Sequence, residues 1–509
     1  MESIEKVFND HEVIVIGSGL GASAAAWKLS GKGKKILVLE RGQWIKRDDS
    51  DWDAKKILVK SQYAAPTPIQ INQYGRGFRP TPYNQNVGGM SVFYGGAAFR
   101  FRENDFTSWP LNYFQFEESY CQAEKALHVH GANPESPLFD SSSPPRSQNF
   151  PFKSIDLTGP SLRILEASHS LGLRPSAVPL ALQFSGGKPQ CIQCLTCDGF
   201  PCKIKAKAEA STVFLEPAIQ NGLSVLTGIH ILKFVFTKNK LQSIEMFSEN
   251  DKQIRVCDVS EKKVILGAGA LGSPTVLLRS NLNTLTHPGN LNLVGRRLMR
   301  HANAVVAGIF FKKINSKKEF QKQIALFDFY DHQKEESGFA TGVIQDIYTP
   351  PKSALAALAP WGLRKLASGF QNRIQNLLCV SEDEPQIENR IEINLNDRGF
   401  FGESLPQIVH AYTKGDLERR NFLISKAKKI LRKSGAKFFH IMEIDSFSHA
   451  LGTLKFGRTP EDSVLDINCK MWGVENLWVL DASFMPSSAG VNPSLTIVAN
   501  ALRVAEKEF

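Results

Sequence analysis

The chain has 509 residues and a mass of 56.5 kDa, which exceeds the roughly 250–300 residues that one hydrophobic core supports, so we expect two domains or one elaborated domain. Its 42% hydrophobic and 22% charged residues are typical of a globular protein and exclude a disordered or fibrous chain. The net charge of +11 is spread along the chain rather than gathered with aromatic residues, so we predict no nucleic-acid partner.

The sequence favours a cytoplasmic protein without a transmembrane segment. It contains no run of about 18 apolar residues, the length that a helix needs to cross a bilayer. The first predicted strand begins at Val13, so little sequence precedes it for a basic and then apolar export signal.

Four short apolar runs predict the buried strands of a parallel sheet. Each run ends close to Gly, Asp or Glu, and the four are Val13–Ile16, Ile36–Leu39, Val264–Leu266 and Leu477–Leu480. Because these runs lie at both ends and in the middle of the chain, one nucleotide-binding domain must be assembled from separated segments.

The first of these strands leads into a turn that is typical of nucleotide binding. Gly17 permits the tight turn, Gly19 lets the backbone approach a pyrophosphate, and the small Ala22 allows helix and strand to pack closely. An Ala-rich helix is expected to run to about Ser30, with unpaired N–H groups at its N-terminus for the phosphates. Glu40 ends the second strand, where an acid accepts both ribose hydroxyls and disfavours NADP. This unit by itself fits NAD or FAD.

The stretches between the strands predict a second, α+β domain. Amphipathic helices are expected over residues 353–378 and 417–434, and irregular loops over residues 133–151 and 283–290.

Four of the eight cysteines crowd into one segment, at Cys191, Cys194, Cys197 and Cys202. Thiolates at such spacing suggest an iron–sulfur cluster or a zinc site. The last gap has four residues and Pro201 precedes the final cysteine, whereas the ferredoxin pattern has three residues and a following Pro. We therefore predict structural thiols or a local disulfide and no metal site, and keep an iron–sulfur/flavin electron-transfer protein as an alternative.

Several separated stretches carry a family resemblance. In chain order they are IGSGLGA with LVLERGQW, NVGGMSVFYGGAAFRF (residues 86–101), VILGAGALGSPTVLLRS (264–280), LVGRRLMRH (293–301), SEDEPQIENRIEI (381–393) and a tail with HALGT, WVLDAS and GVNPSLT. Together they resemble the glucose–methanol–choline (GMC) family of FAD-dependent oxidoreductases, and the opening stretch looks like the cholesterol oxidase branch.

The resemblance implies an α/β fold with two domains. One is a Rossmann-like FAD-binding domain with a parallel central sheet, assembled from residues 1–109, 203–310 and 448–509. The other is an α+β substrate-binding domain with an antiparallel sheet, formed by residues 110–202 and 311–447.

The resemblance also implies FAD as the cofactor. Met90 and Tyr94 depart from the residues usual in the family's Gly-rich segment, and no His lies between Gly88 and Gly96, so we expect non-covalent FAD. The positions expected to bind the cofactor are Gly17, Gly19, Ala22, Glu40, Gly88, Gly89, Ser91, Gly95, Ile231, Gly267, Ala268, Asp481, Ala482, Pro493 and Thr496.

His449 of HALGT and Asn492 of GVNPSLT match the family's catalytic pair. A neutral imidazole, with an unperturbed pKa of about 6.5, can take the hydroxyl proton of an alcohol, so flavin reduction is expected to speed up near that pH. An amide cannot act as a base, but it can orient the hydroxyl or the flavin edge. His301 is expected to be a buried structural residue.

The predicted function is oxidation of a small-molecule alcohol by hydride transfer to flavin N5, with His449 as acid and base. The electron acceptor, O2 or another carrier, is left open. A flavin enzyme of the same fold with lyase or other non-alcohol chemistry is a further alternative.

Overall fold

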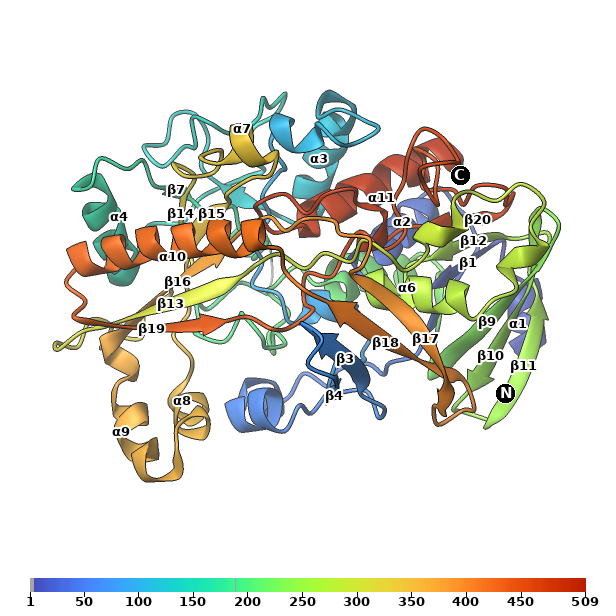
Figure 1. Cartoon of the computed structure of the whole chain (residues 1–509), viewed down its shortest axis with the longest axis horizontal. Coiled ribbons are helices and arrows are strands. Elements are labelled where there is room, and N and C mark those ends of the chain that lie inside the picture. The colour runs from blue at the N-terminus through green and yellow to red at the C-terminus, as the bar shows by residue number, and fades with distance from the viewer. Residues whose placement is uncertain (1–3, 188) are drawn as a thin grey trace.

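The computed structural model describes residues 4–187 and 189–509. A five-stranded parallel sheet lies at the right of Figure 1, in the order β20-β12-β1-β2-β8. Its strands are β1 (Val13–Ile16), β2 (Ile36–Glu40), β8 (Ser224–Thr227), β12 (Lys263–Leu266) and β20 (Leu477–Val479). The four strands predicted from the sequence are confirmed, and they come together from both ends and the middle of the chain.

Sequence analysis missed the edge strand β8. None of its four residues is fully buried, so the stretch SVLT contains no apolar run of the kind that marks the central strands. Its place is decided by parallel pairing with β2, which the local sequence does not reveal.

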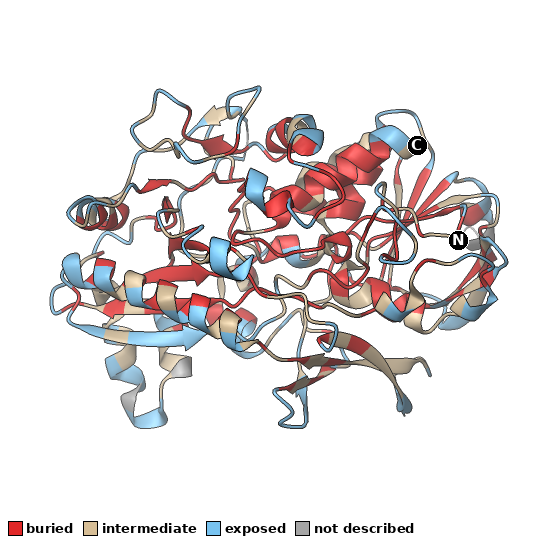
Figure 2. Cartoon of the chain, turned by 45° about the horizontal axis from the view of Figure 1, so that its top comes forward, coloured by how far each residue is buried: buried red, intermediate tan, exposed pale blue. Residues whose placement is uncertain are grey.

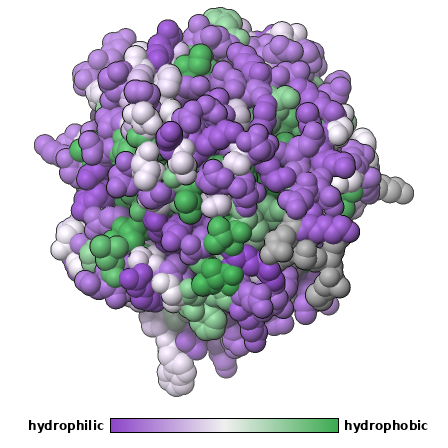
Figure 3. Space-filling view, turned by 90° about the vertical axis from the view of Figure 1, so that its right-hand side faces the viewer, coloured by the Kyte–Doolittle hydropathy of each residue, from purple (hydrophilic) through white to green (hydrophobic). Residues whose placement is uncertain are grey.

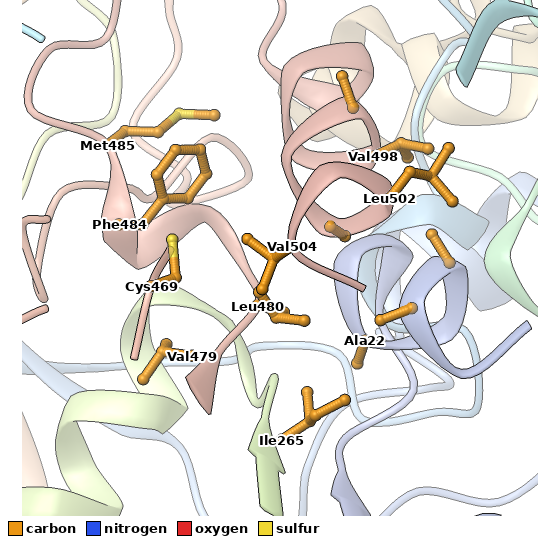
Figure 4. Close-up of a cluster of buried hydrophobic side chains, with 14 of the residues drawn as sticks. Ala22, Ile265, Cys469, Val479, Leu480, Phe484, Met485, Val498, Leu502 and Val504 are labelled. Atoms are coloured by element: carbon orange, nitrogen blue, oxygen red, sulfur yellow. The ribbon is translucent and has the colours of Figure 1, made fainter. Parts of the chain in front are cut away.

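Helices α2 (Leu20–Ser30) and α11 (Ser494–Glu508) pack against each other beside this sheet. Figure 4 shows Ala22 of α2 and Leu502 of α11 in the apolar core that they share with Ile265 of β12. Most residues of α11 are buried (Figure 2). The N-termini of both helices are therefore held in place by an extensive core.

A second sheet has six strands, all antiparallel to their neighbours, and forms the left-hand part of the molecule in Figure 1. Helices α10 (Lys414–Lys433) and α4 (Gly159–His169) pack on it around a separate apolar core. In spatial order the strands are β19 (Phe438–Glu443), β13 (Ala304–Ile309), β16 (Ile374–Val380), β15 (Val343–Ile347), β14 (Ile324–Leu326) and β7 (Ser176–Ala177). The predicted fold class, a parallel α/β part beside an antiparallel α+β part, is confirmed.

Helix α10 confirms the helix predicted over residues 417–434. It begins at a capping box, in which the Thr413 side chain accepts a hydrogen bond from the Asp416 backbone and the Asp416 carboxylate accepts one from the Thr413 backbone. Its buried and exposed sides alternate along the helix in Figure 2, as an amphipathic helix on a sheet requires.

The helix predicted over residues 353–378 is wrong in its second half. Helices α8 (Lys352–Leu358) and α9 (Arg364–Gly369) are present, but residues from Ile374 onward form β16. That strand is paired on both sides, with β13 and β15. An apolar run that is buried on both faces has no distinctive period, so periodicity cannot separate strand from helix there.

The remaining elements surround the two large sheets. Residues 133–151 contain no helix or strand, as predicted, and residues 283–290 are irregular apart from the short turn Leu282–Thr284.

The smaller sheets are β9 (Ile229–Thr237) with β10 (Lys240–Ser248) and β11 (Gln253–Asp258); β17 (Arg390–Arg398), β18 (Ser404–His410), β3 (Ile69–Gln73) and β4 (Phe78–Thr81); and β5 (His130–Gly131) with β6 (Phe152–Lys153). The other helices are α1 (Ile4–Asn9), α3 (Phe114–Ala126), α5 (Glu216–Gln220), α6 (Gly269–Leu278) and α7 (Lys334–Ser337).

Two surface properties complete the description. Within residues 4–187 and 189–509, no helix combines the length and the apolar character that crossing a bilayer requires. The face shown in Figure 3 is mainly hydrophilic with scattered apolar groups, which is normal for a protein surface.

Candidate active site

The turn between β1 and α2 leaves room for a phosphate. Gly17 has a φ of 90°, and a Cβ on it would overlap the Gly267 carbonyl, so only glycine fits. Gly19 has a φ of −68°, and a Cβ there would find its nearest neighbour 4.0 Å away. No side chain of the described chain caps α2 at this point, so the first N–H groups of the helix remain available to an anion.

Close packing of this turn against neighbouring segments explains why Gly21, Ala22 and Gly267 are small residues. A Cβ on Gly267 would collide with the side chain of Ala22, and a Cβ on Gly21 would overlap the carbonyl of Leu480. The backbone N–H of Ala268 donates to the Ser273 hydroxyl at 3.0 Å. The sequence indicated Ala22 and Gly267, but it missed Gly21, which is constrained by Leu480, the residue that follows β20 and lies 459 positions later in the chain.

Glu40 is buried at the end of β2 and organises the same turn. Its Oε2 accepts hydrogen bonds from the backbone N–H of Ser18 at 2.9 Å and from the Ser18 hydroxyl, while Oε1 accepts from Gly42 N at 2.7 Å. Burial raises the pKa of Glu40, and these hydrogen bonds oppose that rise. A carboxylate has about four acceptor positions. Three are occupied, so Glu40 has one left for a ribose hydroxyl rather than the expected two.

The Gly-rich segment lies directly on this turn. Gly88 and Gly89 have φ values of 92° and 56°, and a Cβ on Gly89 would be 3.3 Å from Gly19 Cα. The Gly88 N–H donates to the Ser18 hydroxyl at 2.9 Å. The Ser91 hydroxyl donates to the Gly88 carbonyl at 2.6 Å and also accepts a backbone hydrogen bond. Ser91 therefore shapes the segment through its own protein partners.

A buried lysine, Lys207, fastens the Gly-rich segment to the cysteine segment. Its side chain has no exposed surface, and its ammonium group lies 2.7–3.2 Å from four backbone carbonyl oxygens, those of Val92, Tyr94, Cys197 and Phe200. Sequence analysis missed this residue because one lysine in the run KIKAKAEA carries no distinguishing signal.

Asp481 has no acceptor position left for a ligand. Its Oδ2 accepts from Gly269 N at 2.9 Å and from the Ser273 hydroxyl, and its Oδ1 accepts from both the backbone N–H and the hydroxyl of Ser483. Burial raises the pKa of Asp481. The side chain thus caps the turn Ala482–Phe484 and holds the start of α6. A cofactor can meet this position only through the backbone.

The other predicted cofactor positions lie on three elements. Ile231 is half-buried on β9, where it pairs with Met246. Pro493 precedes the first residue of α11, and the Thr496 hydroxyl inside that helix is 2.8 Å from the Tyr120 hydroxyl. The Ala482 carbonyl accepts a hydrogen bond from the backbone of the HALGT stretch.

His449 touches a second histidine that the sequence analysis left out of the catalytic set. The Nδ1 atoms of His449 and His301 are 3.2 Å apart, and the rings meet edge to face. His301 is buried as expected, but it has a φ of 60°, and its Nε2 is 3.0 Å from the carbonyl oxygen of Ser488. A non-glycine residue in the left-handed region is uncommon and is often found where function demands it.

Burial keeps both rings neutral. It lowers the pKa of His301 to about 4. Burial, and next the adjacent His301, lower the pKa of His449 to about 3. Both values lie well below the 6.5 of a free imidazole, so each ring carries a single N–H at neutral pH.

The hydrogen-bond partners of His301 and His449 then determine which ring nitrogen carries the proton. A carbonyl oxygen only accepts, so His301 must carry its proton on Nε2, facing Ser488, and its Nδ1 is an acceptor. His449 must therefore donate from Nδ1 to His301. This arrangement leaves the lone pair of His449 on Nε2, which has no hydrogen-bond partner among the described residues.

Asn492 is held by a neighbour that the sequence analysis missed. The side-chain N–H of Gln345, on β15, donates to Asn492 Oδ1 at 2.8 Å. Asn492 Nδ2 donates to no residue of the described chain. No direct hydrogen bond joins Asn492 to His449 within residues 4–187 and 189–509; the His301 ring, beside the backbone of Ser488 and Val491, lies between their segments.

The four cysteines of the predicted cluster, Cys191, Cys194, Cys197 and Cys202, form no disulfide, so they are thiols rather than a local disulfide. Among the described residues, no three His, Cys, Asp or Glu side chains gather in a group that could hold a metal ion. The Cys194 thiol lies beside Cys197, whose contact lowers the pKa of Cys194 to about 5. The cysteine segment also contacts the Gly-rich segment. Gly95 of the Gly-rich segment lies against Asp198 of the cysteine segment and against Lys322, and these two charged side chains form an ion pair.

The residues at the parallel sheet fit a flavin dinucleotide. The open position at Gly19, the uncapped N-terminus of α2 and the remaining acceptor position of Glu40 lie on adjacent segments of one turn. These are the features that a pyrophosphate and a ribose require.

Comparison with known proteins identifies the family. Two family models, both described as GMC oxidoreductase, match residues 12–303 and 388–501, which together make up more than half of the chain. The predicted family resemblance is therefore confirmed, and with it FAD as the cofactor and an oxidoreductase acting on CH–OH donors. These matches do not single out the cholesterol oxidase branch.

Individual relatives agree over almost the whole length. The chain is 26% identical to 6'''-hydroxyparomomycin C oxidase of Streptomyces lividus and 26% identical to paromamine 6'-oxidase of Streptomyces fradiae; each alignment covers 97% of this chain and 90% of the relative. Its structure is similar to that of pyridoxine 4-oxidase from Mesorbium loti, with a TM-score of 0.69 at 16% identity, covering 98% and 99% of the two chains.

Proposed function

We propose that the chain, which belongs to the GMC oxidoreductase family, oxidises a small alcohol with His449 as the acid–base residue. The observation that carries this proposal is the unpartnered lone pair on His449 Nε2, which follows from the fixed protons of His301. A general base needs such a lone pair within reach of the proton that it removes.

In the proposed reaction, His449 Nε2 accepts the proton of the substrate hydroxyl. FAD, when bound, supplies the acceptor for the hydride that leaves the carbon bearing this hydroxyl group. Loss of one proton and one hydride converts the CH–OH group into a carbonyl, so atoms and electrons balance. Asn492 supports the step through its unpartnered Nδ2, which can donate to the substrate oxygen while Gln345 holds Oδ1.

His301 acts in this scheme as a positioning residue. It accepts the Nδ1 proton of His449 and so selects the tautomer in which Nε2 is basic. A positive charge on His449 after proton transfer would be shared with His301 through this contact, because neutral His301 remains an acceptor.

We assign the cofactor positions on the same basis. The proposed pyrophosphate contacts are the Gly17 and Gly19 turn and the start of α2, with Glu40 at the ribose. The proposal includes non-covalent attachment, because the Gly-rich segment from Gly88 to Gly96 contains no histidine. The remaining proposed positions are Ala22, Gly88, Gly89, Ser91, Gly95, Ile231, Gly267, Ala268, Asp481 (through its backbone), Ala482, Pro493 and Thr496.

We also propose the division into an FAD-binding domain and a substrate-binding domain. The FAD-binding domain takes residues 1–109, 203–310 and 448–509, and the substrate-binding domain takes 110–202 and 311–447. Because β13 pairs with β16 and β19 of the six-stranded sheet, its residues 304–309 are better assigned to the substrate-binding domain. The electron acceptor in this proposal is O2 or another carrier.

The first test is reduction of the bound flavin without oxygen. Purified holoenzyme, mixed anaerobically with primary and secondary alcohols, is expected to lose its flavin absorbance near ~450 nm. Peroxide formation in air then identifies O2 as an acceptor. A protein whose flavin is reduced by dithionite but by no alcohol would contradict the proposed reaction.

The low pKa of His449 predicts the pH dependence of that reduction. Only the neutral ring accepts a proton, and the neutral fraction falls as the pH drops through the pKa of about 3. The reductive rate should therefore be nearly constant from about pH 5 to 8 and decline only in stronger acid, rather than rise near 6.5 as the free imidazole would suggest. Stopped-flow traces across this range check the expectation, and a midpoint near 6.5 would contradict it.

A further inference from the structure

We propose that the substrate carries several hydroxyl or amino groups and that Asp198, Lys322 and Gln345 recognise them. This inference rests on the proposed function, because it assigns these side chains to the wall of the same site. The substrate class is a hydroxyl-rich ring, such as a sugar or an amino sugar, rather than an aliphatic alcohol.

The first observation is an ion pair between a buried ammonium group and a partly exposed carboxylate. Lys322 Nζ lies 2.7 Å from Asp198 Oδ1, and the Lys322 side chain is only 2% exposed. The second carboxylate oxygen, Asp198 Oδ2, is buried and accepts no hydrogen bond from any described residue. A buried acceptor without a donor is costly, and native proteins almost always satisfy one with a partner or with water.

The second observation places this pair beside the reaction centre. A Cβ on Gly95 would collide with both the Asp198 carboxylate and the Lys322 ammonium group, and Gly95 belongs to the segment proposed to run along the flavin. The same two charges act on His449: Lys322 lowers the pKa of His449 and Asp198 raises it. The ion pair is thus electrostatically coupled to the proposed base.

The third observation is a second unpartnered acceptor, the side-chain oxygen of Gln345. Gln345 is fully buried; its amide N–H binds Asn492, but its Oε1 accepts no hydrogen bond within the described chain. Gln345 on β15 pairs with Ala325 of β14, three residues after Lys322. Gln345 therefore lies on the strand next to β14, which begins two residues after Lys322.

The backbone at Lys322 supports a functional reason for the pair. Its φ is 153°, a value rarely adopted by residues other than glycine, and such strain persists where the surrounding structure requires a particular side-chain position. The ammonium group is held in the interior although burying a charge is unfavourable in itself.

These features select the chemistry of the ligand. The two buried acceptors, Asp198 Oδ2 and Gln345 Oε1, require hydrogen-bond donors, and the Lys322 ammonium group is itself a donor. A ligand with several O–H or N–H groups can donate to both oxygens and accept from Lys322. A hydrocarbon chain against the same wall would leave a charged pair and an amide oxygen without partners, which costs about 1–3 kcal/mol for each group. Hydroxyl and amino donors both meet the requirement.

The test compares substrates and binding in the holoenzyme. Anaerobic flavin reduction is measured with a neutral sugar alcohol, an amino sugar and straight-chain alcohols, and binding without turnover is measured from the flavin difference spectrum of a His449→Ala variant. A lower KM and tighter binding for either hydroxyl-rich compound are expected. Preference for straight-chain alcohols would overturn this inference and leave the proposed function intact, whereas binding of a sugar without flavin reduction would overturn the proposed function alone.

Asp198→Asn is the diagnostic variant, because it removes the charge and keeps the size. We expect the KM and the dissociation constant for the hydroxyl-rich compound to rise by about 10- to 100-fold, and to rise more than the KM for a straight-chain alcohol. The thermal stability should fall as well, because the buried Lys322 ammonium group loses its partner. Asp397→Asn, on the exposed part of β17, is the matched control and should behave as wild type. A shift in the flavin potential with an unchanged dissociation constant would overturn the recognition role.

Discussion

His449→Ala should retain FAD and reduce it 10²–10⁴-fold more slowly than wild type, which corresponds to about 3–5 kcal/mol of barrier. The loss follows from removing the imidazole that contacts His301 and whose Nε2 lone pair is unpartnered among the described residues. Among the described residues, His449 hydrogen-bonds to His301 and to no residue of the cofactor turn, so its removal is not expected to disturb that turn. Anaerobic stopped-flow reduction, together with the flavin content of the purified variant, measures both properties.

Two further variants separate a base from a merely structural ring. His440→Ala removes an exposed histidine on β19 and should leave the rate unchanged. His301→Phe removes the acceptor of the His449 Nδ1 proton, so both tautomers of His449 become accessible, and the rate should fall less than in His449→Ala. If His449→Ala reduces its flavin at the wild-type rate and with the wild-type pH profile, the proton must leave by another route.

Gly19→Val should yield a folded protein that contains almost no FAD. A Cβ at Gly19 meets no protein atom closer than 4.0 Å, so the branched side chain fits the empty turn but occupies the space that a pyrophosphate needs. The expected measurements are a loss of the flavin absorbance after purification and a far-UV circular dichroism spectrum like that of wild-type apoprotein.

The control for this variant is Gly362→Val, since a Cβ at Gly362 also has open space around it but lies far from β1 in the chain. It should keep a full complement of FAD. Gly17→Ala provides the opposite contrast, because a Cβ there would overlap the Gly267 carbonyl, and it should lower the stability of the protein itself. Full flavin occupancy in Gly19→Val would place the pyrophosphate elsewhere.

The proposed reaction and the proposed substrate recognition depend on different side chains. The acid–base step uses His449 and His301, whereas recognition uses Asp198, Lys322 and Gln345. Variants at Asp198, Lys322 or Gln345 are therefore expected to change the substrate preference while His449 remains present to accept the proton.

The parts of the protein that depend on neighbours along the chain could be predicted from the amino-acid sequence. The strand, turn and helix from Val13 to Ser30 were predicted correctly because Gly17, Gly19 and Ala22 act within one local unit. The central strands were predictable for a related reason, since strands buried on both faces must be continuously apolar.

Tertiary structure alone decided the properties that depend on distant partners. The burial that moves the pKa of His449 to about 3, the tautomer selected by the Ser488 carbonyl through His301, and the ion pair between Asp198 and Lys322 all join residues more than a hundred positions apart. A hydrogen bond or a desolvated charge depends on which groups meet in space, and a local pattern contains no record of that meeting.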